Sequence, residues 1–460
     1  MRRIMITAFG SGSGKTVLTG ALLCAFMRKG LFPEGYKCGP DYIDPSFHRQ
    51  VLGVPSHNLD LVLQGEKALH ETLAAGTGQI GVIEGAMGWF DGRGGTAQGS
   101  AWDIAARENI PALLCIRPGG AALTMAAMVN GLKTFRAPDM IRGIFLTDCK
   151  KTLFDYLKPI LERECGLPVT GFLPPMPEMK FESRHLGLVT AEEVTNLKER
   201  FAAAAAVLEQ SGAPEKIFAL AEEAQDAERS GSAPARQSGS GTASSRCRIA
   251  VARDEAFCFY YQESLEALEK CGADLAFFSP LRDEHLPDAQ GLYLGGGYPE
   301  LYAEALSKNT AMKEEIARAV RDGMPTIAEC GGFLYLQRQL EDPDGKTYPM
   351  AGVLPGDGFR AGRLVRFGYC FLEAKEDGLL FRKGEHIPAH EFHHWDSTDC
   401  GSSLAASGSR GGHRRCAFTS PTLYAGFPHL HLGGEKALAE RFAQAAYVYG
   451  EKGGLHEQDA

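Results

Sequence analysis

Residues 4–16 of this chain read Ile4-Met5-Ile6-Thr7-Ala8-Phe9-Gly10-Ser11-Gly12-Ser13-Gly14-Lys15-Thr16. The apolar start suits a β-strand, the glycines and serines suit a tight turn, and residues 16–28 follow with a helical pattern. In such a loop backbone N–H groups close on phosphate oxygens, a lysine reaches the outer phosphates, and the next hydroxyl binds Mg²⁺. The segment therefore predicts a nucleotide-binding loop formed by Gly10, Gly12, Ser13, Gly14, Lys15 and Thr16.

The loop departs from two related patterns. Phe9 stands where the strict motif has a glycine six residues before the lysine. Gly10 stands where partition and septum-placing ATPases have a second lysine. A flexible Gly/Ser turn without a ligand is the alternative interpretation, and the flanking strand and helix patterns argue against it.

Short apolar runs alternate with helical segments through the first 190 residues. We expect strands at residues 4–8, 81–83, 112–116 and 141–146. This alternation is typical of a parallel sheet with helices on both faces.

Two composition changes divide the rest of the chain. Residues 191–224 have a helical composition, and residues 228–245 are rich in Gly, Ser and Pro, which is typical of a linker. A second α/β rhythm begins at residue 248. We therefore predict α/β domains over residues 1–190 and 247–448, joined by a helical segment and flexible linker over residues 191–246. A Gly/Ser/Arg-rich stretch at residues 401–415 is expected to be a surface loop.

Composition excludes several classes of protein. A length of 460 residues suggests two domains, and a net charge of -9 argues against nucleic-acid binding. The twelve cysteines show no CxxC pair and no zinc spacing, which indicates reduced thiols. No apolar run is long enough for a membrane helix, and the N-terminal run is too short for a signal peptide. We therefore expect a cytoplasmic protein with no membrane partner.

Four acidic residues lie in two glycine-punctuated motifs. Asp41 and Asp44 belong to Lys37-Cys38-Gly39-Pro40-Asp41-Tyr42-Ile43-Asp44-Pro45, and Glu84 and Asp91 to residues 82–92. Glu84 ends an apolar strand, which in an α/β sheet places it beside the phosphate loop, where metal ligands occur. Solvated loop carboxylates are the alternative interpretation.

A second reactive motif surrounds Cys330. Residues 325–328 are expected to form a strand, two glycines follow Cys330, and residues 333–336 start a helix. A thiol at such a turn suits a nucleophile, because backbone amides and a helix N-terminus favour the thiolate and an oxyanion. A buried structural thiol is the alternative. The candidate bases are His429 and His431, with His386, His390, His393 and His394 further back.

A triple-glycine segment supplies candidates for the oxyanion hole of this thiol. Residues 291–299 read as a strand that runs into Gly295-Gly296-Gly297. Such a loop can direct backbone N–H groups into a pocket. We predict an oxyanion hole at Gly296, Gly297 and Gly331.

Six motifs in this order resemble those of the cobyrinate a,c-diamide synthase family, the glutamine-dependent amidotransferases of corrinoid synthesis. They are the phosphate loop, residues 39–44, 84–92, 256–261 and 294–300, and Glu329-Cys330-Gly331-Gly332. The resemblance covers residues 1–190 and 247–445. It implies an α/β fold in which a P-loop parallel-sheet domain like that of dethiobiotin synthetase precedes a class I glutamine amidotransferase-like domain.

The resemblance also implies roles for these residues. Cys330 and His429 would release ammonia from glutamine, with ATP and Mg²⁺ bound by the phosphate loop, Lys37, and the metal ligands Thr16, Asp41 and Glu84. A carboxylate of a cobyrinate-type tetrapyrrole would become an acyl phosphate, which ammonia converts to an amide, at the c and then the a side chain. The residues implied to face the macrocycle are Asp41, Tyr42, Ile43, Asp44 and Asp91. A homodimer is compatible with this resemblance.

The triad, the base and the substrate each have more than one interpretation. Related glutaminases carry His-x-Glu, but His431 stands two residues after His429, so the third member of the triad is unassigned. His429 is favoured over His431 as the base. The substrate could also be hydrogenobyrinate or nickel sirohydrochlorin, and a P-loop switch ATPase with an inactive glutaminase module is an alternative from another class.

Overall fold

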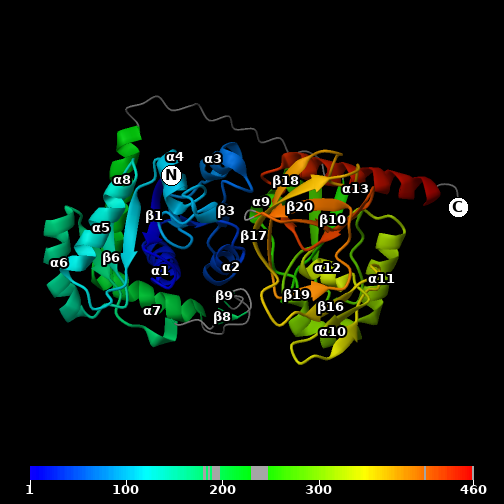
Figure 1. The fold of residues 1–460 in the computed structure, drawn as a ribbon, viewed down its shortest axis with the longest axis horizontal. Coiled ribbons are helices and arrows are strands. Elements are labelled where there is room, and N and C mark those ends of the chain that lie inside the picture. Colours follow the sequence, from blue (N-terminus) through cyan, green and yellow to red (C-terminus); the bar gives the residue numbers. More distant parts are fainter. Residues whose placement is uncertain (180–182, 185–186, 189–196, 229–246, 409–410, 458–460) are drawn as a thin grey trace. The chain divides into compact units, whose positions relative to one another are not determined.

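The computed structural model describes residues 1–179, 183–184, 187–188, 197–228, 247–408 and 411–457 (Figure 1). The predicted linker over residues 228–245 lies almost entirely outside these residues. The chain forms two compact units, one comprising Met1–Leu61 and Gly65–Ser238 and the other Val62–Gln64 and Gly239–Ala460. Each unit has its own sheets and core.

The first unit alternates strands and helices. Its main strands are β1 (Arg2–Ala8), β2 (Pro33–Cys38), β3 (Ser56–Leu59), β4 (Ile80–Glu84), β5 (Ala112–Ile116), β6 (Ile141–Leu146) and β7 (Val169–Phe172). Its helices are α1 (Lys15–Arg28), α2 (Ile43–Phe47), α3 (Gly65–Ala75), α4 (Ala101–Arg107), α5 (Leu123–Phe135), α6 (Lys151–Cys165), α7 (Leu197–Gln210) and α8 (Ala213–Glu228). The short strands β8 (Ser183–Arg184) and β9 (Gly187–Leu188) pair with each other.

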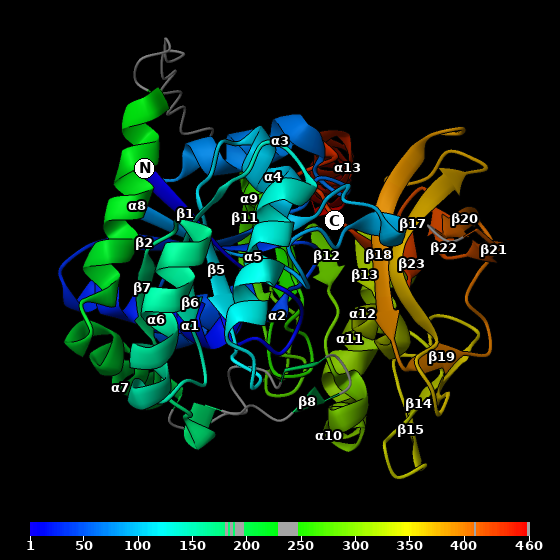
Figure 2. The same ribbon diagram turned by 60° about the vertical axis from the view of Figure 1, so that its left-hand side comes forward.

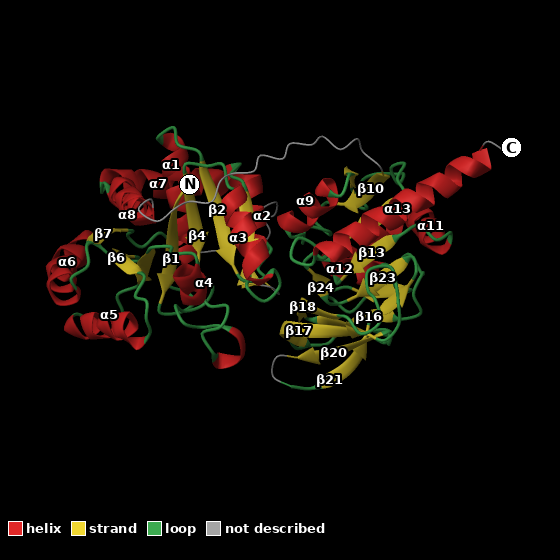
Figure 3. Ribbon diagram, turned by 90° about the horizontal axis from the view of Figure 1, so that it is seen from above, coloured by secondary structure: helices red, strands yellow, loops and turns green. Residues whose placement is uncertain are grey.

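The sheet of this unit has the order β3-β2-β4-β1-β5-β6-β7, and all its pairs are parallel. Because side chains alternate across a strand, Met5 and Ile83 pack on one face, while Ile4 and Val82 pack on the other. Helices α3 to α6 cover the first face, and α1, α7 and α8 cover the second (Figure 3). The predicted parallel sheet with helices on both faces is confirmed.

The helical segment after residue 190 packs onto this same unit. Gly20 of α1 lies against Phe201 of α7, and a Cβ at Gly20 would overlap with the Phe201 ring. Phe201 is fully buried there. Helices α7 and α8 therefore form part of the first unit.

The second unit begins with an α/β arrangement. Its elements up to the reactive turn are β10 (Cys247–Ala252), α9 (Gln262–Lys270), β11 (Ala273–Phe278), β12 (Gly291–Leu294), α10 (Ala303–Lys308), α11 (Thr310–Arg321), β13 (Thr326–Glu329) and α12 (Gly331–Tyr335). The later strands are β14 (Gln339–Glu341), β15 (Thr347–Pro349), β16 (Asp357–Arg360), β17 (Arg366–Ala374), β18 (His386–His393), β19 (Trp395–Ser397), β20 (Leu404–Gly408), β21 (His413–Cys416), β22 (Phe418–Ser420), β23 (Leu423–Gly426) and β24 (His429–Leu430). Helix α13 (Lys436–Glu457) follows.

These strands form three sheets. The main sheet has the order β11-β10-β12-β13-β23-β22 and is parallel except for the β22–β23 pair. A second sheet, β21-β20-β17-β18-β24, is antiparallel, and its long strands β17 and β18 are orange in Figure 2. A small sheet has the order β15-β14-β16-β19. Strand β13, which leads into Cys330, is therefore an interior strand of the main sheet.

The prediction of a surface loop at residues 401–415 is wrong. Much of this stretch forms β20 and β21, which pair antiparallel, and β20 also pairs with β17. Leu404 and Ala406 point into the core and are 1% exposed. Gly411 and Gly412 have positive φ, as hairpin turns require. The small residues thus make a strand pair and its turn.

All twelve cysteines are free thiols, as the sequence predicts. None of the helices that the structure describes has both the length and the apolar composition needed to span a bilayer.

Candidate functional site

The phosphate loop joins β1 to α1 at the carboxyl end of the first sheet. Gly14 caps α1 in the left-handed conformation, with φ of 85°, and a Cβ there would lie 3.2 Å from Thr147. The Lys15 ammonium group donates to the carbonyls of Gly10 at 3.0 Å and Met87 at 2.6 Å. Burial lowers the pKa of Lys15. Because the two carbonyls follow β1 and β4, the ammonium group lies at this end of the sheet.

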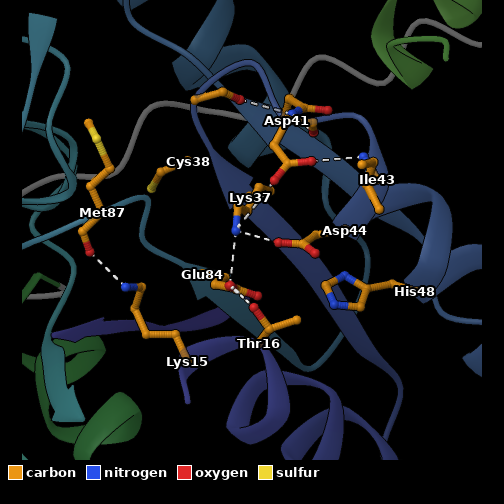
Figure 4. A network of polar contacts seen from close by, with 12 residues as sticks. Lys15, Thr16, Lys37, Cys38, Asp41, Ile43, Asp44, His48, Glu84 and Met87 are labelled. Carbon is orange, nitrogen blue, oxygen red and sulfur yellow. Dashed lines mark hydrogen bonds and ion pairs between the residues drawn. The ribbon is translucent and has the colours of Figure 1, made fainter. Parts of the chain in front are cut away.

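A buried network of charges adjoins this loop (Figure 4). The Thr16 hydroxyl donates to Oε1 of Glu84 at 2.6 Å. Lys37 donates to the same Glu84 oxygen at 2.9 Å, forms an ion pair with Asp44, and lies 3.8 Å from Oδ2 of Asp41. Strands β2 and β4 are neighbours in which Lys37 pairs with Glu84, so the sheet register brings the two motifs together.

The surroundings shift the pKa values of the ionisable groups in this network. Burial, followed by the charge of Asp44, raises the pKa of Glu84 to about 7. For Lys37, burial lowers the pKa, but Asp44, Glu84 and Asp41 outweigh it and hold the pKa well above its ordinary value. Lys37 therefore stays cationic and compensates the buried carboxylates.

The oxygen atoms of this network fit a magnesium ion. Glu84 Oε2 and Asp44 Oδ1 are buried and have no hydrogen-bond partner. Mg²⁺ prefers oxygen ligands and is usually held by one or two carboxylates together with substrate phosphates. Within the described residues no group of three or more His, Cys, Asp or Glu side chains forms a ready-made metal cage. Thr16 and Glu84 thus fit a nucleotide-bound ion.

The residues predicted to face a macrocycle have different surroundings. Tyr42 and Ile43 are each 7% exposed, and Asp44 is 1% exposed beside Lys37. The Asp41 side chain is 39% exposed. Asp91 accepts a hydrogen bond from the N–H of Gly88 at 2.9 Å. Asp44 therefore joins the buried charge network, and Asp41 is the more accessible of the two carboxylates.

The sequence did not point to His48. It is buried beside Asp44, and its Nδ1 lies 3.1 Å from the Ser56 hydroxyl. Burial lowers the pKa of His48 to about 4, so the ring is neutral. His48 lies in no recognisable sequence motif. Only the fold brings it next to the charge network.

In the second unit Cys330 stands at a sharp turn between β13 and α12. Its backbone has φ of 47°, a conformation that L residues rarely adopt, and its N–H donates to the Gly426 carbonyl at 2.8 Å. A Cβ at Gly332 would overlap with the Leu294 carbonyl. The two glycines therefore let the turn approach β12, and the predicted strand–turn–helix is confirmed.

The expectation of a favoured thiolate is wrong. Burial, followed by the charges of Glu300 and Glu391, raises the pKa of the Cys330 thiol well above its ordinary value. Helix α12 has five residues, and its amides do not outweigh these effects. The thiol thus carries its proton and needs a base.

The structure brings His429, and not His431, to the glycine loop. A Cβ at Gly296 would overlap with Cε1 of His429 and would lie 3.1 Å from its Nε2. His431 accepts a hydrogen bond at Nδ1 from the N–H of Gly434 at 2.9 Å, and its Nε2 lies 3.6 Å from Glu263 Oε2. Of these two histidines, His429 is therefore the one whose ring contacts the glycine loop.

The four earlier histidines have other surroundings. His390 is buried, and burial lowers its pKa to about 3. His393 stacks on the Phe427 ring with centroids 3.9 Å apart, and His386 is exposed. His394 is half-buried next to the Phe392 ring. None of these contacts places a ring nitrogen at the glycine loop.

The glycine loop packs against the reactive turn. Gly331 lies so close to it that an added Cβ would be 3.0 Å from the backbone nitrogen of Gly297. A Cβ at Gly297 would overlap with the Ala256 carbonyl, so this position requires glycine. Gly296 also accepts a hydrogen bond from the Phe259 N–H at 3.0 Å. The three predicted oxyanion-hole residues are thus neighbours in space.

Comparison with known proteins agrees with this architecture. A family model described as the CobQ/CobB/MinD/ParA nucleotide binding domain matches residues 4–189, and one described as the CobB/CobQ-like glutamine amidotransferase domain matches residues 248–437. A cobyrinate a,c-diamide synthase of Caldanaerobacter subterraneus subsp. tengcongensis is 36% identical over 98% of this chain and 100% of its own. The chain belongs to the cobyrinate a,c-diamide synthase family.

Further members of this family support the assignment. The Clostridium tetani relative is 36% identical over 85% of this chain and 87% of its own, and the Priestia megaterium relative is 34% identical over 96% of each. The predicted fold class is confirmed, with a P-loop unit preceding a glutamine amidotransferase unit. Membership in the diamide synthase family confirms a glutamine-dependent amidating ligase with an amidotransferase role in corrinoid biosynthesis.

Proposed function

We propose that this enzyme amidates the a and c carboxylates of cobyrinate through acyl phosphates, with ATP as phosphoryl donor and glutamine as nitrogen source. The observation that carries the proposal is the presence of two different reactive arrangements in one chain. One is the Thr16–Glu84 pair at the phosphate loop. The other is the Cys330 elbow, which packs against the glycine loop that His429 also contacts. The names of the relatives supply the identity of the substrate.

The first unit would carry out phosphoryl transfer. A substrate carboxylate oxygen attacks the γ-phosphorus of ATP, the β–γ bridge bond breaks, and ADP leaves with an acyl phosphate formed. Lys15 and Lys37 would neutralise phosphate charge, and Gly10 to Thr16 would hold the triphosphate. Thr16, Glu84 and Asp41 would hold Mg²⁺, which stabilises negative charge on the transferring phosphoryl group.

Ammonia would complete the amide. Its lone pair attacks the carbonyl carbon of the acyl phosphate, the carbon–oxygen bond to phosphate breaks, and inorganic phosphate leaves. The nitrogen then loses a proton to give the neutral amide. A carboxylate alone is a poor electrophile, so phosphorylation creates the leaving group that the reaction lacks.

The second unit would supply the ammonia. His429 takes the proton of the Cys330 thiol as sulfur attacks the carboxamide carbon of glutamine, and the oxyanion forms near the N–H groups of Gly296, Gly297 and Gly331. His429 then returns the proton to the leaving nitrogen, which departs as ammonia. Water hydrolyses the thioester and releases glutamate. Burial raises the pKa of the Cys330 thiol, which fits a mechanism in which a base takes its proton.

The macrocycle would contact the segment from Asp41 to Asp44 and the loop that carries Asp91. Asp91 is exposed and the Asp41 side chain is 39% exposed, whereas Asp44 is buried. Hydrogenobyrinate and nickel sirohydrochlorin carry comparable side-chain carboxylates, so the substrate must be established by direct assay. We propose a homodimer as the assembly to test by sedimentation.

The deciding experiment measures ADP release and product mass with cobyrinate, hydrogenobyrinate or nickel sirohydrochlorin, together with MgATP and either glutamine or ammonium. We expect the wild type to use both nitrogen sources and Cys330→Ala to use ammonium alone. A product whose mass is lower by the replacement of two carboxyl OH groups with NH2 groups identifies the diamide. If neither protein forms ADP with any of the three macrocycles, the synthetase proposal is wrong.

A further inference from the structure

Glu329 lies directly before the reactive cysteine, at the end of β13, and is 2% exposed. Its Oε2 lies 3.5 Å from Nδ1 of His429 and accepts a hydrogen bond from the Tyr293 hydroxyl at 3.1 Å. Its Oε1 accepts a hydrogen bond from the N–H of Leu430 at 2.9 Å. One carboxylate therefore contacts both the side chain of the candidate base and the backbone of the strand that carries it.

The strand geometry explains how the neighbouring residues Glu329 and Cys330 point in different directions. In β13 Glu329 and Ile327 share one face, and Ile327 is in register with Tyr293 of β12. Glu329 thus points towards Tyr293, while the turn with φ of 47° carries Cys330 away from that face. The adjacent residues Glu329 and Cys330 therefore place a carboxylate near Nδ1 of His429 and a thiol at the turn.

The two nitrogens of His429 have different neighbours. Nδ1 lies at the Glu329 carboxylate, whereas Nε2 lies 3.1 Å from where a Cβ of Gly296 would be. The glycine loop in turn packs against Gly331, next to Cys330. A carboxylate that holds a proton on Nδ1 leaves the lone pair of Nε2 directed to the glycine loop, as general-base catalysis requires.

The charges around Glu329 support the same assignment. Among the described residues no lysine or arginine forms an ion pair with Glu329. The group that it contacts and that can become a cation is the His429 imidazole. A buried anion is costly unless it is compensated. A proton moving from Cys330 to His429 would create an imidazolium beside this anion, so the carboxylate stabilises the state that carries the reaction forward.

We infer that Glu329 is a positioning residue that orients His429 and stabilises its protonated form, and so fills the place of the carboxylate absent two residues after His429. This inference rests on the proposed roles of Cys330 and His429. His431 offers a comparison, because its Nε2 lies 3.6 Å from another buried carboxylate, that of Glu263.

The test compares Glu329→Gln with Glu263→Gln, which makes the same change at the other histidine–carboxylate pair. For Glu329→Gln we expect glutaminase kcat to fall by about 10² to 10⁴-fold with KM for glutamine unchanged. We also expect the pH profile of Cys330 alkylation by iodoacetamide to shift to higher pH. Glu263→Gln should retain the kcat and the alkylation profile of the wild type. Ammonium-dependent amidation, unchanged in both variants, shows that the first unit is intact.

Each outcome separates this inference from the proposed function. If Cys330→Ala still uses glutamine, the proposed glutaminase site is wrong. If Cys330→Ala loses glutamine use but Glu329→Gln keeps the wild-type kcat and alkylation profile, the Glu329 inference alone is overturned. If Glu329→Gln does not fold, Glu329→Asp is the deciding variant. Its shorter side chain holds the carboxylate farther from His429, so glutaminase kcat must fall while KM for glutamine stays unchanged. A wild-type kcat in the Asp variant would then overturn the inference.

Discussion

The Thr16 hydroxyl donates a 2.6 Å hydrogen bond to the buried carboxylate of Glu84. Thr16 lies in the first turn of α1, and Glu84 ends β4, 68 residues later in the chain. Strand β4 pairs with β1, which leads into the phosphate loop, and this pairing brings the two side chains together. The contact thus joins the nucleotide loop to the carboxylate network.

Removing the hydroxyl of Thr16 or the carboxylate of Glu84 should impair phosphoryl transfer and leave glutamine hydrolysis intact. For Thr16→Ala and Glu84→Gln we expect ammonium-dependent ADP formation to fall by about 10²-fold or more, because each change removes an oxygen proposed to bind Mg²⁺. Glutamine hydrolysis by the second unit should persist. Thr16→Ser keeps the hydroxyl and should remain active. Wild-type rates of ADP formation in both Thr16→Ala and Glu84→Gln would contradict the proposed metal site.

The binding of MgADP should depend on pH through Glu84. Its pKa, raised to about 7 chiefly by burial, means that the carboxyl group is neutral below this value and must lose a proton to bind a cation. We therefore expect the calorimetric Kd for MgADP to tighten from pH 6 to pH 8, by up to about tenfold per unit below pH 7. Glu84→Gln should lose this dependence. A Kd equal at pH 6 and pH 8 in the wild type would rule out the proposed titration.

The raised pKa of Glu84 makes the free energy of unfolding fall as pH rises, whereas it makes MgADP binding tighten. A carboxyl pKa raised by folding favours the neutral form of the native protein. The contribution of Glu84 to the free energy of unfolding is therefore largest at low pH, and it is lost as pH rises from about 4.3, the unfolded value, to the folded value of about 7. Bound Mg²⁺ reverses this loss, because it stabilises the ionised form.

Lys37 should be critical for the stability of the first unit. Its ammonium group contacts the buried carboxylates of Asp44 and Glu84, and Lys37→Met would leave them uncompensated. Such a loss costs about 3–5 kcal/mol of unfolding free energy, and more at pH 8 than at pH 5, where the carboxyl groups can be protonated. Urea unfolding followed by tryptophan fluorescence measures it. Lys29→Met removes the exposed ion pair with Glu215 and should leave the midpoint unchanged.

How far sequence predicts this molecule depends on the range of the interactions. Strands such as β5 and the Cys330 elbow are local features, set by apolar runs and adjacent glycines, and both were predicted. The Glu329–His429 contact joins residues 100 positions apart, so no local pattern announces it. The raised thiol pKa of Cys330 was missed for the same reason, because its burial and the approach of Glu300 and Glu391 arise only in the fold. The hairpin of β20 and β21 was missed because its small residues are also common in loops.

The space beside Gly296 should control the glutaminase selectively. A Cβ there would overlap with Cε1 of His429, and the ring cannot easily move away because it is 2% exposed. Gly296→Ala must therefore displace the imidazole from its position between Glu329 and the glycine loop, and a misplacement of about 1 Å can reduce a rate by about 10²-fold. We expect glutamine-dependent amidation to fall by that order while ammonium-dependent amidation persists. Gly378→Ala is the matched control, because its nearest neighbour would be 3.4 Å from the new Cβ, an ordinary contact, and it should keep both activities. If Gly296→Ala hydrolyses glutamine at the wild-type rate, His429 does not act from the position that the structure gives it.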